Sequence, residues 1–220
     1  MNNPISFFQN KISQASIQKV IEVSDKLGIL SDWLLAVMYF ESKLNPQAIN
    51  QVSGSVGLIQ FTRDKSGVNY KTINGKKYLL SDLQKMNFSE QMDVVYEYLK
   101  PFKSKMSSFE DVYLTVFFPL AVGKVQSYVL KTSSLSANLI ASQNKIFDLN
   151  KDGQITKKEF TDFISNKYLT SFKEVVKKKI IMQKLSDFWN NHQEAIISTV
   201  VGVALTIGVF FMFFKVSKKR

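Results

Sequence analysis

The feature that most constrains this chain is a run of twenty residues without a charged side chain, from Ala195 to Phe214 (AIISTVVGVALTIGVFFMFF). At about 1.5 Å per residue, a helix of that length is roughly 30 Å long, which matches the hydrocarbon thickness of a bilayer. A buried core helix is the alternative, but core helices rarely remain apolar on every face over about five turns. The sequence therefore predicts a single C-terminal transmembrane helix.

The basic residues around this segment indicate its orientation. Six residues follow it, and four of them are basic, whereas the fifteen residues before it contain only Lys184. The positive-inside rule then places the C-terminus in the cytoplasm and the rest of the chain outside. A lysine-rich stem at 171–194 precedes the segment. It is either a solvated helix face or a contact with anionic lipid headgroups.

The composition limits the partners of the chain. The 220 residues are 45% hydrophobic and 21% charged, which is typical of a globular protein with one compact domain and accessory segments. The formal net charge of +11 favours an anionic partner: nucleic acid, a lipid surface or a bacterial envelope polymer. We expect no nucleic-acid partner, because the sequence has no recognised module or aromatic platform for one. The lack of cysteine excludes a disulfide scaffold, a thiol nucleophile and a cysteine-ligated metal.

Apolar residues at helical spacing predict a mainly α fold with little strand. A glycine-bearing, loop-rich stretch interrupts the helices between residues 50 and 78. The expected helices cover 12–28, with Gly28 as the stop, 33–41, preceded by Ser31-Asp32 as the cap, 88–102, 109–130 and 157–190.

Glu41 ends the second of these helices, which is apolar almost all round. It shares one helical face with Leu34 and Met38, at spacings of three and four. Burial raises the pKa of a carboxylic acid, which suits a general acid working near neutral pH. From periodicity alone, a solvated glutamate at the helix end is the more common outcome.

Three ordered elements change that balance: Glu41-Ser42, then Asn45-Pro46-Gln47-Ala48, then residues 53–60 (SGSVGLIQ). Together they resemble the signature of lytic transglycosylases, in the soluble-transglycosylase branch of the lysozyme-like superfamily that includes goose-type lysozyme. In that family a helix ends in Glu-Ser, and a glycine-bearing turn leads into Gly-Leu-Met-Gln; here the turn reads Gly-Leu-Ile-Gln. The resemblance covers roughly residues 15–130 and implies a lysozyme-like catalytic domain.

The resemblance also implies a chemistry. Glu41 would protonate the glycosidic oxygen between N-acetylmuramic acid and N-acetylglucosamine, then take the proton of the muramic acid C6 hydroxyl as that hydroxyl closes a 1,6-anhydro ring. Ser42 would orient the glutamate or the substrate. A Tyr-Asn-Ala-Gly-like element of the family is replaced here by residues 117–124, which lack the tyrosine, and Tyr113 lies nearby. The implied substrate-binding residues are Ser42, Gly57, Leu58, Gln60 and Tyr113.

Two other functions stay open. A hydrolysing lysozyme would need a second carboxylate about 6.5–9.5 Å from Glu41 to activate water, and Asp64 and Asp82 are the nearest candidates in sequence. A non-enzymatic wall-binding membrane protein could keep the fold without the activity. The intact Glu41-Ser42 pair argues against that interpretation.

Residues 148–159 (DLNKDGQITKKE) fit the twelve-residue EF-hand loop. Gly153 stands at the sharp turn of position 6. The alternative is an ordinary Asp-Gly turn before a helix. Only one such loop is visible, so we expect a structural Ca²⁺ at the junction of enzyme and anchor. The predicted ligands are Asp148, Asn150, Asp152, Gln154, Thr156 and Glu159.

These features predict a single-pass membrane protein whose catalytic domain faces peptidoglycan. The N-terminal residues lack the charged start and apolar core of a secretory signal peptide, which fits a tail-inserted protein or one carried in a virus particle. An anchored enzyme would suit a phage with an internal membrane. The expected organisation is a catalytic domain at 1–135, a calcium-binding segment at 136–170, the stem at 171–194, the membrane helix at 195–214 and a basic tail at 215–220.

Overall fold

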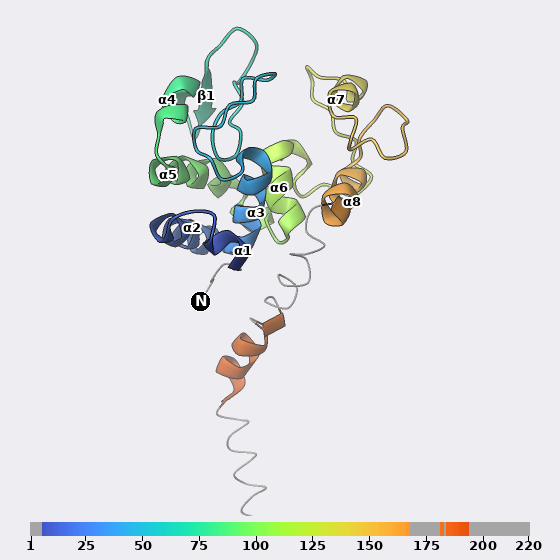
Figure 1. Ribbon diagram of the computed structural model, residues 1–220. Helices are drawn as coiled ribbons and strands as arrows, with labels where there is room; N and C mark the ends of the chain where they lie inside the picture. Colours follow the sequence, from blue (N-terminus) through green and yellow to red (C-terminus); the bar gives the residue numbers. More distant parts are fainter. Residues whose placement is uncertain (1–5, 168–180, 183, 194–220) are drawn as a thin grey trace, which may run out of the picture. The chain divides into compact units, whose positions relative to one another are not determined.

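The computed structural model describes residues 6–167, 181–182 and 184–193 (Figure 1). The chain divides into two compact units, residues 1–169 and residues 170–220. The predicted membrane helix at 195–214, the basic tail and most of the stem lie outside the described residues. Within the described ranges, no helix has the length and apolar character needed to cross a bilayer.

The first unit is mainly α-helical, as the sequence predicts. Its α-helices are α1 (Ser6–Gln9), α2 (Gln14–Leu27), α3 (Ser31–Ser42), α4 (Leu80–Lys85), α5 (Phe88–Leu99), α6 (Phe109–Phe117), α7 (Ala137–Gln143) and α8 (Lys157–Lys167). Two 3₁₀ helices, η1 (Lys100–Lys105) and η2 (Pro119–Ala121), follow α5 and α6. The strands β1 (Tyr70–Ile73) and β2 (Lys76–Leu79) form an antiparallel hairpin.

The hairpin was not expected, although the sequence carries a signal for it. Ile73 pairs with Lys76, so the two strands are joined by the two-residue turn Asn74-Gly75. Both turn residues have positive φ, 48° and 79°. Asn-Gly is the dipeptide most often found in this kind of turn, because both positions need a left-handed backbone.

The helix boundaries follow the local sequence, with corrections at three of the predicted helices. The predicted helix at 12–28 is α2, which Ser13 caps and Gly28 (φ 72°) ends. The expected Ser31-Asp32 cap is wrong: α3 begins at Ser31, and Leu30 occupies the cap position without a side-chain hydrogen bond. The helix expected at 109–130 ends at Phe117 instead.

Two prolines explain why the helices predicted at 88–102 and 109–130 are shorter than expected. Pro119 restricts the residue before it, and Phe118 has an extended φ of −149°. The chain then forms the short helix η2 rather than continuing α6. Pro101 lies in the first turn of η1, where the α-helical pattern of α5 gives way to a tighter 3₁₀ turn.

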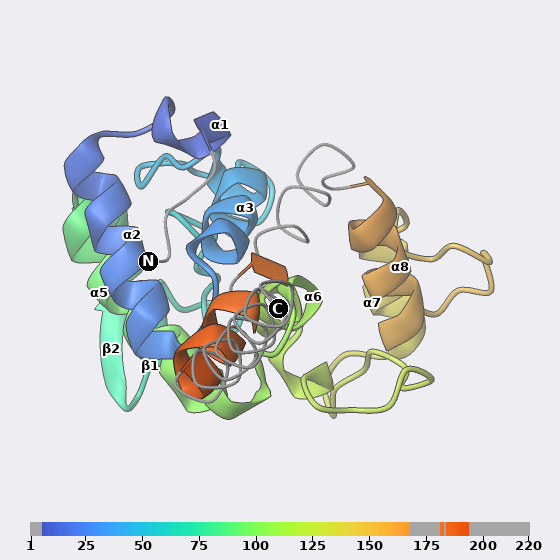
Figure 2. The same ribbon diagram turned by 90° about the horizontal axis from the view of Figure 1, so that it is seen from below.

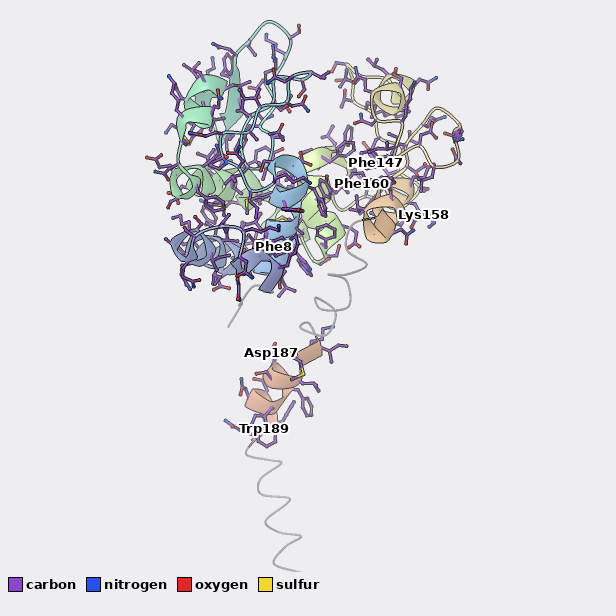
Figure 3. All side chains as sticks on the ribbon, in the orientation of Figure 1. Phe8, Phe147, Lys158, Phe160, Asp187 and Trp189 are labelled. Atoms are coloured by element: carbon purple, nitrogen blue, oxygen red, sulfur yellow. The ribbon has the colours of Figure 1, made fainter. Side chains whose placement is uncertain are left out.

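Helix α3 is the centre of the first unit. Figures 1 and 2 show α2 and α5 on one side of it and α6 on the other, and α3 packs against both α2 and α6. Leu34, Leu35 and Met38 are fully buried along its length. Near the C-terminal end of α3, the ring of Tyr39 meets the ring of buried Phe8 from α1, which is labelled in Figure 3. The buried central helix therefore carries Glu41 at the edge of the core.

Residues 136–167 belong to the same compact unit as the helices that precede them. Helix α8 packs against α6. The loop before α8 also pairs with an earlier segment of the chain: Leu130 N donates to Ile155 O at 2.8 Å, and Lys157 N donates to Tyr128 O at 2.8 Å. These contacts join the predicted calcium-binding segment to the predicted catalytic domain.

Candidate active site

Glu41 lies in the last turn of α3 and is half-buried. Burial raises the pKa of its carboxyl above the ordinary value, and a hydrogen bond from the Tyr113 side chain acts in the opposite direction. The two effects are complementary. Burial favours the protonated acid, while the tyrosine hydroxyl stabilises the carboxylate once that proton has gone.

Tyr113 reaches Glu41 from α6 and is itself almost fully buried, at 5% exposure. Its ring lies nearly parallel to that of Phe40, with the centroids 6.3 Å apart, and it also meets the rings of Phe109 and Phe160. These rings fix the direction in which the hydroxyl points. The sequence places Tyr113 close to an altered family element, and the structure brings it to the carboxylate.

The turn at Gly57–Gln60 has a backbone that few residue types adopt. Gly57 has φ of 80°, and Gln60 has φ of 54°, a left-handed conformation that costs a non-glycine residue roughly 1–3 kcal/mol. The side-chain amide nitrogen of Gln60 donates to Gly57 O at 3.0 Å, which closes the turn. Leu58 is fully buried, and Gln60 is partly exposed. Of the predicted residues in this turn, Gln60 is the one with an accessible side chain.

Ser42 connects the end of α3 to this turn. Its hydroxyl lies 2.9 Å from Met38 O and 3.0 Å from Leu58 O, and the residue is buried. The hydroxyl thus holds the turn beside the helix that carries Glu41. A direct contact between Ser42 and a sugar stays a prediction.

Gln91 is a supporting residue that lies outside the sequence motifs. It lies on α5 and is fully buried. Its side-chain oxygen accepts a hydrogen bond from Leu58 N, and its amide nitrogen donates to Pro46 O at 2.9 Å and to Leu83 O at 2.7 Å. A glutamine beside Met92 on the apolar face of an amphipathic helix was the available signal, since a buried amide needs partners.

Asp64 and Asp82 are the two candidates for the carboxylate that would activate water in a hydrolase. Asp64 accepts hydrogen bonds from Thr72 N at 3.2 and 3.1 Å and pairs with Lys71 at 3.5 Å. Desolvation acts to raise the pKa of Asp64, but these contacts hold it below the ordinary value. Asp82 is exposed in the first turn of α4. Asp64 therefore stabilises the β1–β2 hairpin, and its carboxylate is engaged there.

The loop at 148–159 is organised by its own oxygen atoms. The Asp148 carboxylate accepts from Asp152 N at 3.2 Å and from Gly153 N at 3.0 Å. The Asn150 side-chain oxygen accepts from Asp152 N at 2.9 Å. Gly153 has φ of 82° with open space around it, so the glycine serves the backbone turn and not a tight contact.

Glu159 and Thr156 form a reciprocal cap at the start of α8. Thr156 N donates to the Glu159 carboxylate at 2.9 Å, and Glu159 N donates to the Thr156 hydroxyl at 3.1 Å. Glu159 also accepts from Asn150 N at 3.3 Å, so it spans the loop. In the described part of the chain, no three His, Cys, Asp or Glu side chains come close enough together to hold a metal ion. An ion here would therefore need amide, hydroxyl and backbone oxygens as well as carboxylates.

Comparison with known families supports the catalytic part of this site. Residues 18–94 match the family described as Transglycosylase SLT domain. The match includes Glu41, the turn at 57–60 and Gln91, and it ends before Tyr113. It supports a lytic transglycosylase of the lysozyme-like superfamily acting on peptidoglycan, at the level of the family. No curated protein and no solved structure matches the chain.

Proposed function

We propose that this protein is a peptidoglycan lytic transglycosylase that cleaves the β-1,4 bond between N-acetylmuramic acid and N-acetylglucosamine with Glu41 as its acid and base. The observation that carries the proposal is the environment of the Glu41 carboxyl. The residue lies in the last turn of a buried helix, burial raises the pKa of its carboxyl, and the Tyr113 hydroxyl donates to that carboxyl. It also lies within the region that matches the transglycosylase family.

In the first step, the protonated Glu41 gives its proton to the glycosidic oxygen. The bond between that oxygen and the muramic acid C1 breaks, and the electron pair leaves with the N-acetylglucosamine oxygen. Positive charge develops at C1, as in other glycoside cleavages. A carboxyl whose pKa is raised by burial is suited to this step, because burial favours the protonated form that gives up the proton.

In the second step, the Glu41 carboxylate removes the proton of the C6 hydroxyl while that oxygen bonds to C1. The product is a 1,6-anhydro ring, Glu41 is protonated again, and no water is consumed. One carboxyl serves both steps, so a second carboxylate is not required. The hydrogen bond from Tyr113 stabilises the ionised form between the two steps.

We also propose a structural Ca²⁺ in the loop at 148–159. Two observations support this proposal. The residue types match the EF-hand template, and the side-chain oxygens of Asp148, Asn150 and Glu159 accept hydrogen bonds from backbone N–H groups within the same loop. The capping contact of Thr156 and Glu159 explains those two residues without an ion. It does not explain why Asp148, Asn150 and Asp152 occupy alternate positions.

The segment at 195–214 supports a further proposal, that the enzyme is tethered to a bilayer with its catalytic unit on the peptidoglycan side. The support is the uncharged sequence and the basic tail after it. Delivery in the internal membrane of a phage particle is one form of this proposal. Detection of the protein in the lipid fraction of purified virions would support it, and its absence from such particles would contradict it.

The test of the activity uses the full chain in detergent on purified sacculi in a zymogram. The wild-type chain should clear the sacculi, and Glu41→Gln should not, because the amide cannot donate or accept the proton. The control Glu90→Gln changes a carboxylate in the capping box of α5, and it should clear the sacculi. Clearing by Glu41→Gln equal to that of the wild type would contradict the assignment. Binding to sacculi without clearing by the wild type would favour a non-enzymatic wall-binding protein.

A further inference from the structure

An aromatic contact joins α8 to the candidate active site, and the binding of an ion by the loop would not require that contact. Phe160, the first residue after the loop, is fully buried. Its ring meets the ring of Tyr113 edge to face, with the centroids 5.6 Å apart and an interplanar angle of 72°. Tyr113 is the residue whose hydroxyl donates to Glu41. One ring therefore separates the end of the loop from the residue that holds the candidate acid.

Phe160 is itself held in place by neighbouring rings. Phe117 of α6 stacks on it, with the centroids 4.7 Å apart and the planes 9° from parallel, and Phe147 meets it at 5.0 Å. Figure 3 shows Phe147 and Phe160 on the side of α8 near α6, and Lys158 on the opposite side. Aromatic pairs prefer a restricted set of geometries, so this cluster defines the distance between α8 and α6.

Polar contacts also connect α8 to α6 and to the segment that follows α6. Lys157 is buried, and its ammonium donates to Lys124 O at 3.0 Å and lies 3.9 Å from the Asp111 carboxylate. Farther along α8, the Ser165 hydroxyl bonds to the Glu110 carboxylate. Asp111 and Lys157 line a polar cavity of about 430 Å³, so solvent reaches the polar side of this interface. The apolar contact of Phe160 is the part that is closed to water.

We propose that Phe160 is a positioning residue for the candidate active site, because its ring fixes Tyr113 in the orientation that places the tyrosine hydroxyl on the Glu41 carboxylate. The loop and α8 are then part of the catalytic unit rather than a separate junction with the anchor. The inference rests on the proposed roles of Glu41 and Tyr113. It does not require an ion in the loop.

The test compares Phe160→Leu with Phe163→Leu in the full chain. Phe163 lies one turn farther along α8, and its ring packs on Phe147 at 5.0 Å, so the control makes the same chemical change on the same helix. Tyr113→Phe serves as the reference for complete loss of the hydroxyl. The first measurement is the ¹³C NMR titration of the Glu41 side-chain carboxyl, assigned with Glu41→Gln. The second is the dependence of kcat/KM on pH.

We expect Tyr113→Phe to raise the pKa of Glu41, because the hydrogen bond that lowers it is lost. Its kcat/KM should fall about tenfold, as for loss of a hydrogen bond to a charged group. Phe160→Leu should change both quantities in the same direction by a smaller amount, and Phe163→Leu should keep the wild-type values. Phe160→Met, whose flexible unbranched side chain can fill an irregular gap in a core, provides a second variant that should also change both quantities by a smaller amount than Tyr113→Phe.

A Phe160→Leu chain that is less stable but keeps the wild-type pKa of Glu41 and the wild-type pH dependence would overturn the inference. Equal shifts in Phe160→Leu and Phe163→Leu would also overturn it, because the effect would then be general loosening of α8. The NMR titration needs no substrate. If the wild-type chain does not cleave sacculi, the proposed function fails, and the titration still decides whether Phe160 positions Tyr113.

Discussion

The substitution Gly57→Ala should destabilise the protein more than its size suggests. Gly57 begins the turn that follows the Glu41 helix, and its φ is 80°. A Cβ atom at this position would lie 2.5 Å from the Gln91 side-chain oxygen and 2.6 Å from its nitrogen. Real Cβ atoms do not approach other heavy atoms so closely. The substitution therefore has two costs, a backbone cost and the displacement of Gln91.

Each cost has an order of magnitude. A left-handed conformation costs a residue with a Cβ roughly 1–2 kcal/mol. Displacement of Gln91 breaks its buried hydrogen bonds to Leu58 N, Pro46 O and Leu83 O. An unsatisfied buried group costs roughly 1–3 kcal/mol, and partial relaxation keeps the sum below three full penalties. Together we expect about 3–5 kcal/mol. For a unit of this size that lowers Tm on the order of 10 °C.

Gly67→Ala is the matched control. Gly67 also has φ of 80°, and no heavy atom lies within 4 Å of the Cβ position. This variant has the backbone cost alone, about 1–2 kcal/mol. Thermal and urea unfolding of the two variants, followed by circular dichroism, should differ by about 2–3 kcal/mol, the part assigned to Gln91.

A double-mutant cycle with Gln91→Ala tests the assignment of the second cost. In the Gln91→Ala background the clash is removed, so Gly57→Ala should cost only its backbone part. Equal destabilisation by Gly57→Ala and Gly67→Ala would refute the reasoning. So would a Gly57→Ala effect that is unchanged when Gln91 is absent, because the two changes would then be independent.

Three further predictions follow from the site. Glu41→Gln should raise Tm at pH 8 but not at pH 4. The pKa of Glu41 is raised in the folded state, so the stability that its carboxyl provides below the unfolded pKa of about 4.5 is lost as pH rises through the folded pKa. Equal Tm differences at both pH values would contradict this. Tyr113→Phe should move the alkaline limb of kcat/KM to higher pH, since the acid keeps its proton longer; an unmoved limb would exclude the hydrogen bond as a determinant. Ca²⁺ removal with a chelator should lower the Tm of the wild type and leave that of Glu159→Gln almost unchanged; a chelator that does not change the wild-type Tm would rule out a structural ion.

The sequence was sufficient where a local pattern determined the structure. Apolar spacing and a terminal glycine located α2 to within two residues, and the apolar character of residues 33–41 placed α3 at the centre. The Glu-Ser pair and the Gly-Leu-Ile-Gln turn pointed to Glu41 as the candidate acid. These are features that a few adjacent residues specify.

The supporting contacts depended on packing between distant segments, which no local pattern specifies. Tyr113 is more than seventy residues from Glu41, and Gln91 is more than thirty from Leu58. The altered family element at 117–124 lacks the tyrosine, so the sequence indicates Tyr113, one helix turn earlier, as a substrate-binding residue and not as a partner of Glu41. The pairing of the 128–130 segment with the loop at 148–159 was also missed, because three residues are too few to show strand periodicity.

The most direct test of the central claim is the mass spectrometry of muropeptides that the full chain releases from purified sacculi. A transglycosylase reaction at Glu41 should release fragments that end in 1,6-anhydro-N-acetylmuramic acid, one water lighter than the corresponding hydrolysis products and resistant to borohydride reduction. Glu41→Gln should release none of them. Fragments with free, reducible N-acetylmuramic acid ends would contradict the account and identify the protein as a hydrolysing lysozyme.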